Sequence, residues 1–261
     1  MKVGVVGVGV VGAATAELLR RLKHEVHTFD TNGTGTHGTL EGLAAAVEVA
    51  VVCVPTPAGL MGRLDTSLVR YACTVLRAVP VTVLRSTVPV GTCRELHGNV
   101  VYWPEFCNAR SALADMETTR DVYLGGPDAL TALVQNKLLA PGIDLWRTYH
   151  LYRWEELEAF KLVANAAMAV KVAFANEAKA VVEKYGAAWP IVAKLLARDD
   201  RLGHTGWQVP GPDGLPGFGG ACLPKDLAGF CAQGEDAGRP AWVADAARRM
   251  NKKVRPPEAK K

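Results

Sequence analysis

The first 150 residues alternate short apolar runs with longer segments of helical composition. We expect strands where β-rich, apolar residues cluster, at 3–6, 25–29, 47–54, 79–84, 100–103, 121–124 and 143–146. Helical stretches lie between some of these runs, at 13–23 and 67–77. Strands that alternate with helices are typical of a parallel sheet with both faces covered. The pattern therefore predicts an α/β domain over residues 1–150.

The pattern changes near Tyr152. Residues 154–185 contain no Pro or Gly and are rich in Ala, Glu, Lys and Val. A single helix of this length would extend about 45 Å at 1.5 Å per residue. A Gly/Pro-rich loop at 203–220 separates a shorter helix near Pro190 from helices expected at 225–233 and 240–251. We predict a helical domain over 151–251, built on the long helix, followed by a basic tail over 252–261.

Charge is unevenly distributed along the chain. The chain has 261 residues, is 49% hydrophobic and carries a net charge of +4. Residues 248–261 contain seven basic side chains and one acid, a local charge of +6, which leaves −2 for the other 247 residues. A solvated terminus explains such a tail better than a nucleic-acid partner does. The composition excludes disordered, collagen-like and disulfide-stapled proteins.

The cysteines and the apolar runs indicate a cellular compartment. The six cysteines form no CxxC pair and no Cys/His spacing suited to zinc, so we expect no metal and reduced thiols. No apolar run reaches the roughly 18 residues that span a bilayer. The start of the chain, MKVGVVGVGVVG, has no small-residue cleavage site. These features predict an unprocessed cytoplasmic protein without a membrane segment.

A glycine turn follows the first predicted strand. Gly7, Gly9 and Gly12 form a GxGxxG pattern that opens a helix, and Asp30 ends the next strand 18 residues after Gly12. Such glycines let the backbone approach a pyrophosphate at a helix N-terminus. Asp30 can accept hydrogen bonds from a ribose 2′-hydroxyl and would repel a 2′-phosphate, which favours NAD over NADP. A glycine turn without a ligand is the alternative, and the strand–turn–helix context disfavours it.

Four further segments have the composition of a reactive centre. Segments 53–57 (CVPTP) and 85–92 (RSTVPVGT) each end a predicted strand, so both belong at the carboxyl edge of the sheet. Lys161 and Asn165 are spaced i, i+4 on the long helix, and Asn176 returns to nearly the same face. Segment 217–226 (GFGGACLPKD) places a cysteine in a glycine-rich turn before a helix.

Each of these features also has a structural explanation. Lys161 and Asn165 could form a solvated stripe, and a cysteine such as Cys222 is often a small buried hydrophobic residue. A thiol at a helix N-terminus beside a lysine, however, is in the setting that lowers a cysteine pKa. The other five cysteines lack that setting, and we expect them to be structural.

The motifs together resemble those of the UDP-glucose/GDP-mannose dehydrogenase family. The glycine turn, CVPTP, STVPVGT, PEF at 104–106, KLVAN…KVAFANE and GFGGACLPKD occur in the family order. The resemblance implies a reduced Rossmann-type, doubly wound parallel sheet followed by the helical domain. It implies NAD-dependent, four-electron oxidation of a nucleotide-sugar primary alcohol, with UDP-glucose as the first choice, to the carboxylate through a cysteine thiohemiacetal and thioester. It also implies a homodimer built on the long helix.

The resemblance assigns roles residue by residue. Cys222 resembles the nucleophile; Lys161 and Asn165 resemble the pair that holds the reacting oxygen; Thr87 and Asp226 position or activate a water. Glu105 resembles the residue that assists thioester hydrolysis, Lys225 helps to keep the thiol ionised, and Arg201 reaches the substrate across a dimer. The implied NAD contacts are Gly7, Gly9, Val10, Val11, Gly12, Asp30, Val54, Pro55, Thr56, Ser86, Thr87 and Lys225. The implied substrate contacts are Glu105, Phe106, Lys161, Asn165, Arg201, Phe218, Gly219 and Cys222.

The sequence also departs from the family pattern. Segment 107–109 (CNA) replaces a stretch that carries a second Glu in the family, the segment after Asp30 is short, and the loop 201–222 is expanded. The chain stops about where relatives begin a C-terminal domain that binds the substrate nucleotide. Three hypotheses follow: a minimal nucleotide-sugar 6-dehydrogenase, an NAD-dependent enzyme for a different primary alcohol, and a non-catalytic NAD-binding subunit. The joint presence of the candidate catalytic residues argues against the third.

Overall fold

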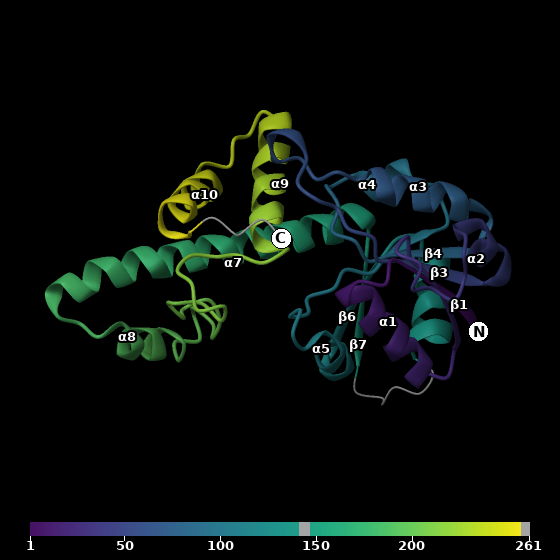
Figure 1. Ribbon diagram of the computed structural model, residues 1–261, viewed down its shortest axis with the longest axis horizontal. Coiled ribbons are helices and arrows are strands. Elements are labelled where there is room, and N and C mark those ends of the chain that lie inside the picture. The colour runs from purple at the N-terminus through teal and green to yellow at the C-terminus, as the bar shows by residue number, and fades with distance from the viewer. Residues whose placement is uncertain (141–146, 257–261) are drawn as a thin grey trace. The chain divides into compact units, whose positions relative to one another are not determined.

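The computed structural model describes residues 1–140 and 147–256, which form two compact units. The first, called the sheet unit here, comprises Met1–Pro57 and Asp65–Lys161. The second, the helical unit, comprises Ala58–Leu64 and Leu162–Lys261. The boundary at Lys161 lies inside the long helix α7 (Trp154–Val182), so that helix starts in one unit and continues in the other (Figure 1).

The sheet unit is built on a seven-stranded sheet among the described residues, in the order β2-β1-β3-β4-β5-β6-β7. Neighbouring strands are parallel except for the antiparallel pair β5 and β6. The strands are β1 (Lys2–Val6), β2 (Glu25–Phe29), β3 (Val49–Val52), β4 (Val81–Leu84), β5 (Val100–Tyr102), β6 (Asp121–Gly125) and β7 (Thr148–Tyr152). Strand β2 lies on one side of β1 and β3 lies on the other, so the order in which strands are added to the sheet reverses between β1 and β3. Ligands bind at this switch point in such folds. The predicted Rossmann-type sheet is confirmed.

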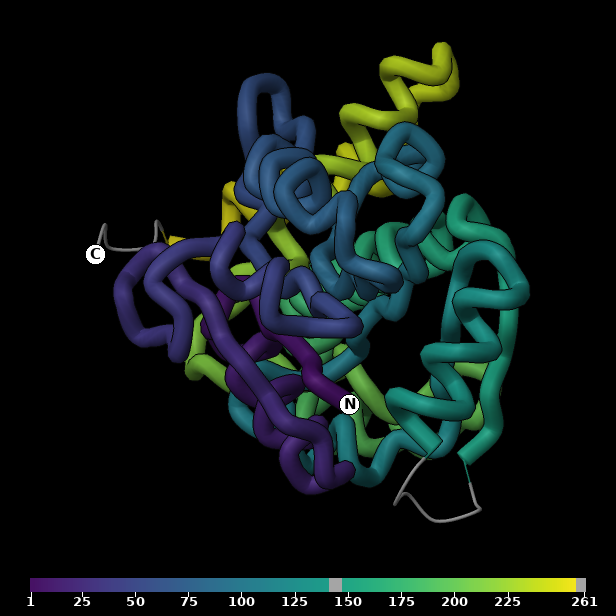
Figure 2. The backbone as a smooth tube through the Cα atoms, turned by 90° about the vertical axis from the view of Figure 1, so that its right-hand side faces the viewer, coloured from purple at the N-terminus to yellow at the C-terminus, as the bar shows by residue number. Residues whose placement is uncertain are grey.

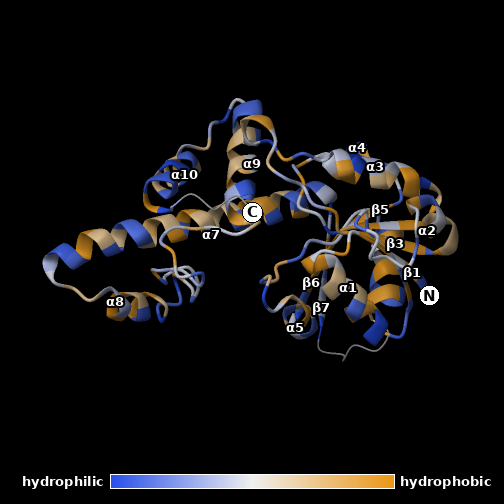
Figure 3. Cartoon of the chain, viewed as in Figure 1, coloured by the Kyte–Doolittle hydropathy of each residue, from blue (hydrophilic) through white to orange (hydrophobic). Residues whose placement is uncertain are grey.

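Helices cover both faces of this sheet (Figure 1 and Figure 2). They are α1 (Val10–Arg21), α2 (Leu40–Ala46), α3 (Ser67–Val75), α4 (Thr92–Glu95), α5 (Ala112–Thr118) and α6 (Asp128–Leu133), with the 3-10 turn η2 (Leu76–Ala78) and the π-helix η3 (Val134–Leu139). One core includes α1 and α5, and the other includes α2 and α3. Because both faces are covered, strands such as β3 are entirely apolar and buried (Figure 3).

Sequence periodicity missed several of these elements. Helix α2 follows the short segment after Asp30, and Thr39 caps it by accepting a hydrogen bond from the Gly42 N–H. Helices α5 and α6 were also not predicted, because helices this short carry little periodic signal. The strand predicted at 143–146 lies outside the described residues, and β7 begins at Thr148.

The helical unit consists of α7 from Leu162 onward, η4 (Glu183–Tyr185), α8 (Trp189–Leu196), α9 (Leu223–Asp236) and α10 (Trp242–Val254), together with η1 (Leu60–Gly62). Small residues on α7, such as Ala166, Ala169 and Ala173, allow close packing with α9 and α10. The predicted long helix is confirmed: α7 ends at Val182, η4 continues it to Tyr185, and Gly186, at φ +81°, caps η4. Helix α10 extends to Val254, so the expected tail boundary at residue 252 falls within a helix. Residues 257–261 of that predicted tail lie outside the described residues.

The short segment Ala58–Leu64 packs on α9, although it lies far from α9 in the sequence. The Leu64 side chain lies where a Cβ at residue 229 would be, so this contact needs Gly229. Arg63 forms an ion pair with Asp236. In the part of the chain that the structure describes, no helix combines the length and apolar character needed to cross a membrane. The same residues contain no cluster of His, Cys, Asp or Glu arranged to hold a metal ion.

Candidate active site

The glycine turn joins β1 to α1 and has three different glycine environments. Gly7 has φ +85°, a conformation that L side chains rarely adopt. A Cβ at Gly12 would overlap the Gly7 carbonyl oxygen, whereas a Cβ at Gly9 would meet nothing within 4 Å. Helix α1 begins at Val10, three residues before the predicted start, and Gly9 is its cap. The open space beside Gly9 and the N-terminal N–H groups of α1 are therefore available to an anionic ligand.

Asp30 lies beside this turn, after the end of β2. One of its carboxylate oxygens accepts the Val8 N–H at 2.6 Å, and the other accepts the Asn32 N–H at 3.0 Å. Each oxygen retains a second lone pair for a ribose hydroxyl. Asp30 thus fixes the glycine turn in addition to lying where a ribose contact was predicted.

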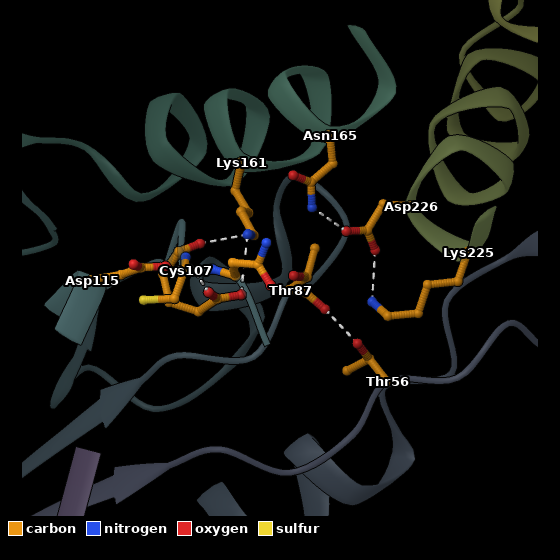
Figure 4. Close-up of polar contacts among 10 residues, drawn as sticks. Thr56, Thr87, Cys107, Asp115, Lys161, Asn165, Lys225 and Asp226 are labelled. Atoms are coloured by element: carbon orange, nitrogen blue, oxygen red, sulfur yellow. Dashed lines mark hydrogen bonds and ion pairs between the residues drawn. The ribbon is translucent and has the colours of Figure 1, made fainter. Parts of the chain in front are cut away.

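The loops after β3 and β4 are joined by two side-chain-to-backbone hydrogen bonds. The Thr56 hydroxyl donates to the Thr87 carbonyl oxygen at 2.7 Å (Figure 4). The Ser86 hydroxyl donates to the Val54 carbonyl oxygen at 2.7 Å. Thr56, Ser86 and Thr87 are all buried. The sheet therefore brings together two loops that are separated by about thirty residues in the sequence, as the strand order predicts.

Lys161 and Glu105 form a buried ion pair within the sheet unit (Figure 4). The Lys161 ammonium donates to the Glu105 carbonyl oxygen and, at 3.2 Å, to Glu105 Oε1. The second carboxylate oxygen of Glu105 accepts the Cys107 N–H at 2.8 Å. The ring of Phe106 lies 4.9 Å from Lys161 Nζ and packs against Phe160. Helix α7 and the PEF motif are therefore linked by Lys161 and Glu105, the two residues to which the family resemblance assigned catalytic roles.

Asn165 belongs to a second polar cluster, within the helical unit. Its amide nitrogen donates to Asp226 Oδ2 at 2.5 Å, and Lys225 Nζ donates to Asp226 Oδ1 at 2.6 Å (Figure 4). Asp226 is fully buried in the first turn of α9, where the helix dipole favours a negative charge. The two residues predicted to act as a pair on α7 therefore have different acidic partners: Lys161 contacts Glu105, and Asn165 contacts Asp226.

Cys222 is the cap residue at the N-terminus of α9 and is exposed. The other cysteines are buried or half-buried, and burial raises the pKa of Cys53 and Cys107 to about 11 and that of Cys73 to about 12. Burial also raises the pKa of Cys93 and Cys231. All six lie in the described part of the chain, so Cys222 is the one cysteine with an exposed side chain.

Phe218 and Arg201, two further predicted substrate contacts, have contrasting environments. Phe218 is buried in the core of the helical unit. Arg201 is 86% exposed and pairs with Asp199 at 2.5 Å.

Asn176, which shares a helix face with Asn165, accepts the Gly217 N–H at 2.8 Å and so supports the glycine loop before Cys222.

Two buried charged residues near these loops were given no role from the sequence. Glu158 is fully buried, and its carboxylate accepts the N–H groups of Gly91 and Cys93, each at 2.7 Å. Burial raises the pKa of Glu158. Arg85 is buried, with its guanidinium 3.6 Å from the ring centroid of Trp103. The sequence did contain a signal for each residue: Glu158 is an acid on the buried face of a helix, and Arg85 is an arginine at the end of an apolar strand.

Family models match most of the chain. Residues 34–141 match the NAD binding domain, and residues 155–253 the central domain, of the UDP-glucose/GDP-mannose dehydrogenase family. The chain belongs to this family. The first match confirms the predicted cofactor, NAD.

Individual members of the family are similar over most of this chain. UDP-glucose 6-dehydrogenase TuaD of Bacillus subtilis is 28% identical over 248 residues, which are 88% of this chain and 52% of that protein. The UDP-glucose 6-dehydrogenase of Pseudomonas aeruginosa is 29% identical over 237 residues, 84% of this chain and 51% of that protein. The chain thus spans about half the length of these curated relatives.

A solved family structure has the same fold. The structure of a UDP-glucose dehydrogenase from Pyrobaculum islandicum superimposes with a TM-score of 0.84 at 25% identity. The match covers 97% of this chain and 68% of that one. These relatives are all named UDP-glucose dehydrogenases, which is the predicted class of enzyme.

Proposed function

We propose that this chain oxidises the primary alcohol of a nucleotide sugar, UDP-glucose in first place, to the carboxylate in an NAD-dependent, four-electron reaction. The observation that carries the proposal is the environment of Cys222, an exposed thiol at the N-terminus of α9 in the family motif GFGGACLPKD. The naming of the relatives as UDP-glucose 6-dehydrogenases supports the choice of substrate.

The residues of the glycine turn fit a dinucleotide. NAD, when bound, supplies the hydride acceptor. The N–H groups at the start of α1 would bind its pyrophosphate beside Gly9, where no protein atom occupies the space of a side chain. Asp30 would accept a hydrogen bond from a ribose hydroxyl while its other contacts hold the turn.

Lys161 and Asn165 retain donors for the reacting oxygen. A lysine ammonium has three N–H groups, and two of those of Lys161 are directed to Glu105. The Asn165 amide has two N–H groups, and one donates to Asp226. In the proposal the remaining donors stabilise the negative charge that develops on the substrate oxygen.

Cys222 would carry the intermediate between the two oxidations. Its sulfur attacks the carbon of the aldehyde formed in the first oxidation, a C–S bond forms, and the thiol proton passes to the carbonyl oxygen. Loss of a second hydride and of the hydroxyl proton leaves a thioester. Water then attacks the thioester carbon with Glu105 as the base, the C–S bond breaks, and the thiolate and the carboxylic acid are released.

The deciding experiment measures NADH formed per substrate molecule with UDP-glucose, GDP-mannose, free sugars and simple alcohols. We expect two NADH per UDP-glucose in the wild type, and loss of acid formation in Cys222→Ser. Cys231→Ala, a buried thiol in the same helix, is the matched control. NADH formation from a simple alcohol alone would favour the second hypothesis. Dinucleotide binding without turnover of any of these compounds would favour a non-catalytic subunit.

We also propose a homodimer located in the cytoplasm. Large apolar side chains of α7 and α8 are exposed, including Phe174 at 57%, Ile191 at 64% and Leu195 at 61%. An apolar surface of this kind is typical of a subunit interface. All six cysteines lie in the described part of the chain and are thiols, which supports a reducing compartment. Sedimentation of only a 27.9 kDa monomer at micromolar concentration would contradict the dimer and the role of Arg201 across it.

A further inference from the structure

The glycine loop that precedes Cys222 has no regular secondary structure of its own. Gly217 and Gly220 have φ values of +75° and +78°, and α9 begins only at Leu223. Such a backbone loses much conformational entropy when it is held in one conformation. The position of the thiol therefore depends on contacts that other elements make with this loop.

Asn251, in the last turn of α10, binds both backbone groups of Phe218. Its amide nitrogen donates to the Phe218 carbonyl oxygen at 2.9 Å, and its amide oxygen accepts the Phe218 N–H at 2.8 Å. Asn176 accepts the N–H of the preceding residue, Gly217, at 2.8 Å. Two asparagine side chains, from α7 and α10, thus satisfy consecutive backbone groups of the loop as a neighbouring strand would.

Arg255, directly after α10, packs against the next residue of the loop. A Cβ at Gly219 would overlap the Arg255 guanidinium, so this contact requires a glycine. The guanidinium donates to Asp213 Oδ2 at 2.5 Å, and the Arg255 side chain is only 10% exposed. Asp213 belongs to the expanded loop before the motif, and the Arg255 hydrogen bond holds the pKa of its carboxyl below the usual range.

We propose that Asn251 and Arg255 are positioning residues that hold the glycine loop, and with it the Cys222 thiol, in its reactive geometry. They act on Phe218 and Gly219, three to four residues before the sulfur, and make their contacts within the helical unit. The expanded loop takes part through Asp213, which orients Arg255. The sequence predicted a solvated tail from residue 252 onward. In the proposal, the end of α10 and Arg255 instead position the catalytic thiol. The proposal rests on the proposed function only where it concerns turnover.

The first test measures the thiol without requiring turnover. A nitroxide spin label on Cys222, the exposed cysteine, reports the mobility of the loop by electron paramagnetic resonance in the folded chain of 261 residues. We expect a narrowed, more mobile spectrum in Asn251→Ala and in Arg255→Ala. Arg249→Ala is the matched control, because Arg249 lies in the same helix and pairs with Asp245. The control should have the wild-type spectrum.

The second test measures turnover with UDP-glucose. We expect kcat to fall about tenfold in the two alanine variants while the affinity for NAD is unchanged, because misplacement of a reacting group affects the chemical step. Asn251→Asp, which keeps an acceptor for the Phe218 N–H, and Arg255→Lys should recover part of the loss. An immobile label in folded variants would overturn the positioning role even if kcat fell. Mobile labels in a protein without turnover would support the positioning role and contradict the proposed function.

Gly219→Ala covers the case in which the alanine variants do not fold. It displaces the guanidinium without removing a polar group. A folded Gly219→Ala variant is expected to have a mobile label at Cys222, and a wild-type spectrum would contradict the proposal.

Discussion

Lys161 contacts Glu105 at two points, the backbone carbonyl oxygen and the carboxylate, with one ammonium group. The two side chains are 3% and 10% exposed, so both charges are largely removed from water. Each charge is therefore compensated mainly by the other. Removal of one partner leaves the second buried and unpaired, which is costly in a way that an exposed ion pair is not.

Replacement of Lys161 by Met should lower the free energy of unfolding by about 3 kcal/mol, because Glu105 then lacks its cation. The measurement is equilibrium urea unfolding. The double variant Lys161→Met/Glu105→Gln is the control and should be more stable than the single variant, since it removes both charges. A single-variant loss near that of a surface pair, below about 1 kcal/mol, would show that water screens this pair.

Substitutions at Gly12 and Gly9 should have different effects, the first on stability and the second on NAD binding. Gly12→Ala places a methyl group on the Gly7 carbonyl oxygen, so we expect a lower melting temperature. Gly9→Ala meets no protein atom and should leave the melting temperature unchanged while it weakens NAD binding, because the methyl group enters the space left for the pyrophosphate. Differential scanning fluorimetry and NAD titration measure the two effects. Equal NAD affinity in Gly9→Ala and wild type would place the dinucleotide elsewhere.

Asp30 should contribute both charge and hydrogen bonds, and two substitutions distinguish these contributions. Asp30→Asn keeps an acceptor for the Val8 N–H but removes the charge and the acceptor for the Asn32 N–H, so it should lose discrimination against NADP while keeping the Val8 contact with the turn. Asp30→Ala should also weaken binding of both cofactors, because the Val8 N–H loses its partner. Isothermal titration with NAD and NADP gives the ratio of affinities. An unchanged ratio in Asp30→Asn would remove Asp30 from the ribose.

The cysteines should react with iodoacetamide in an order set by burial. A thiol with its pKa raised to about 11, such as Cys53 or Cys107, has about a hundredfold less thiolate at pH 8 than one at the ordinary value of 9.0. Mass spectrometry of the native protein should therefore find Cys222 modified first and Cys73 and Cys93 last. The buried thiols should become reactive in urea. Modification of Cys53 before Cys222 would contradict the assigned environments.

Glu158 should give the protein an unusual pH dependence. Burial raises its folded pKa above the ordinary 4.5, so its contribution to stability is fully present below pH 4.5 and decreases as pH rises through the folded value. A glutamine at this position does not titrate. The stability deficit of Glu158→Gln relative to wild type should therefore be larger near pH 4 than near pH 7. The difference between the two deficits should be about 1.4 kcal/mol for each tenfold decrease in the acid dissociation constant of Glu158 on folding. Urea unfolding at the two pH values measures this difference, and a constant deficit would indicate a carboxyl with an ordinary pKa.

The sequence alone determined the features that depend on local pattern. Strand and helix alternation predicted the parallel sheet, because buried strands of such a sheet are apolar throughout. The uninterrupted segment before Gly186 predicted α7, since neither proline nor glycine breaks it. The glycine turn and Asp30 predicted an NAD site, because the backbone conformations and the acid are needed within one β–α–β unit.

Only the tertiary structure decided which polar groups support which loop. Glu158 binds backbone groups 65 and 67 residues away, Asn165 binds an acid 61 residues away, and Asn251 binds a loop 33 residues away. No periodicity in the sequence reports such pairs, because each depends on how separate elements pack. A buried charge or amide is stabilised by the partners that packing brings to it, and those partners assign its function.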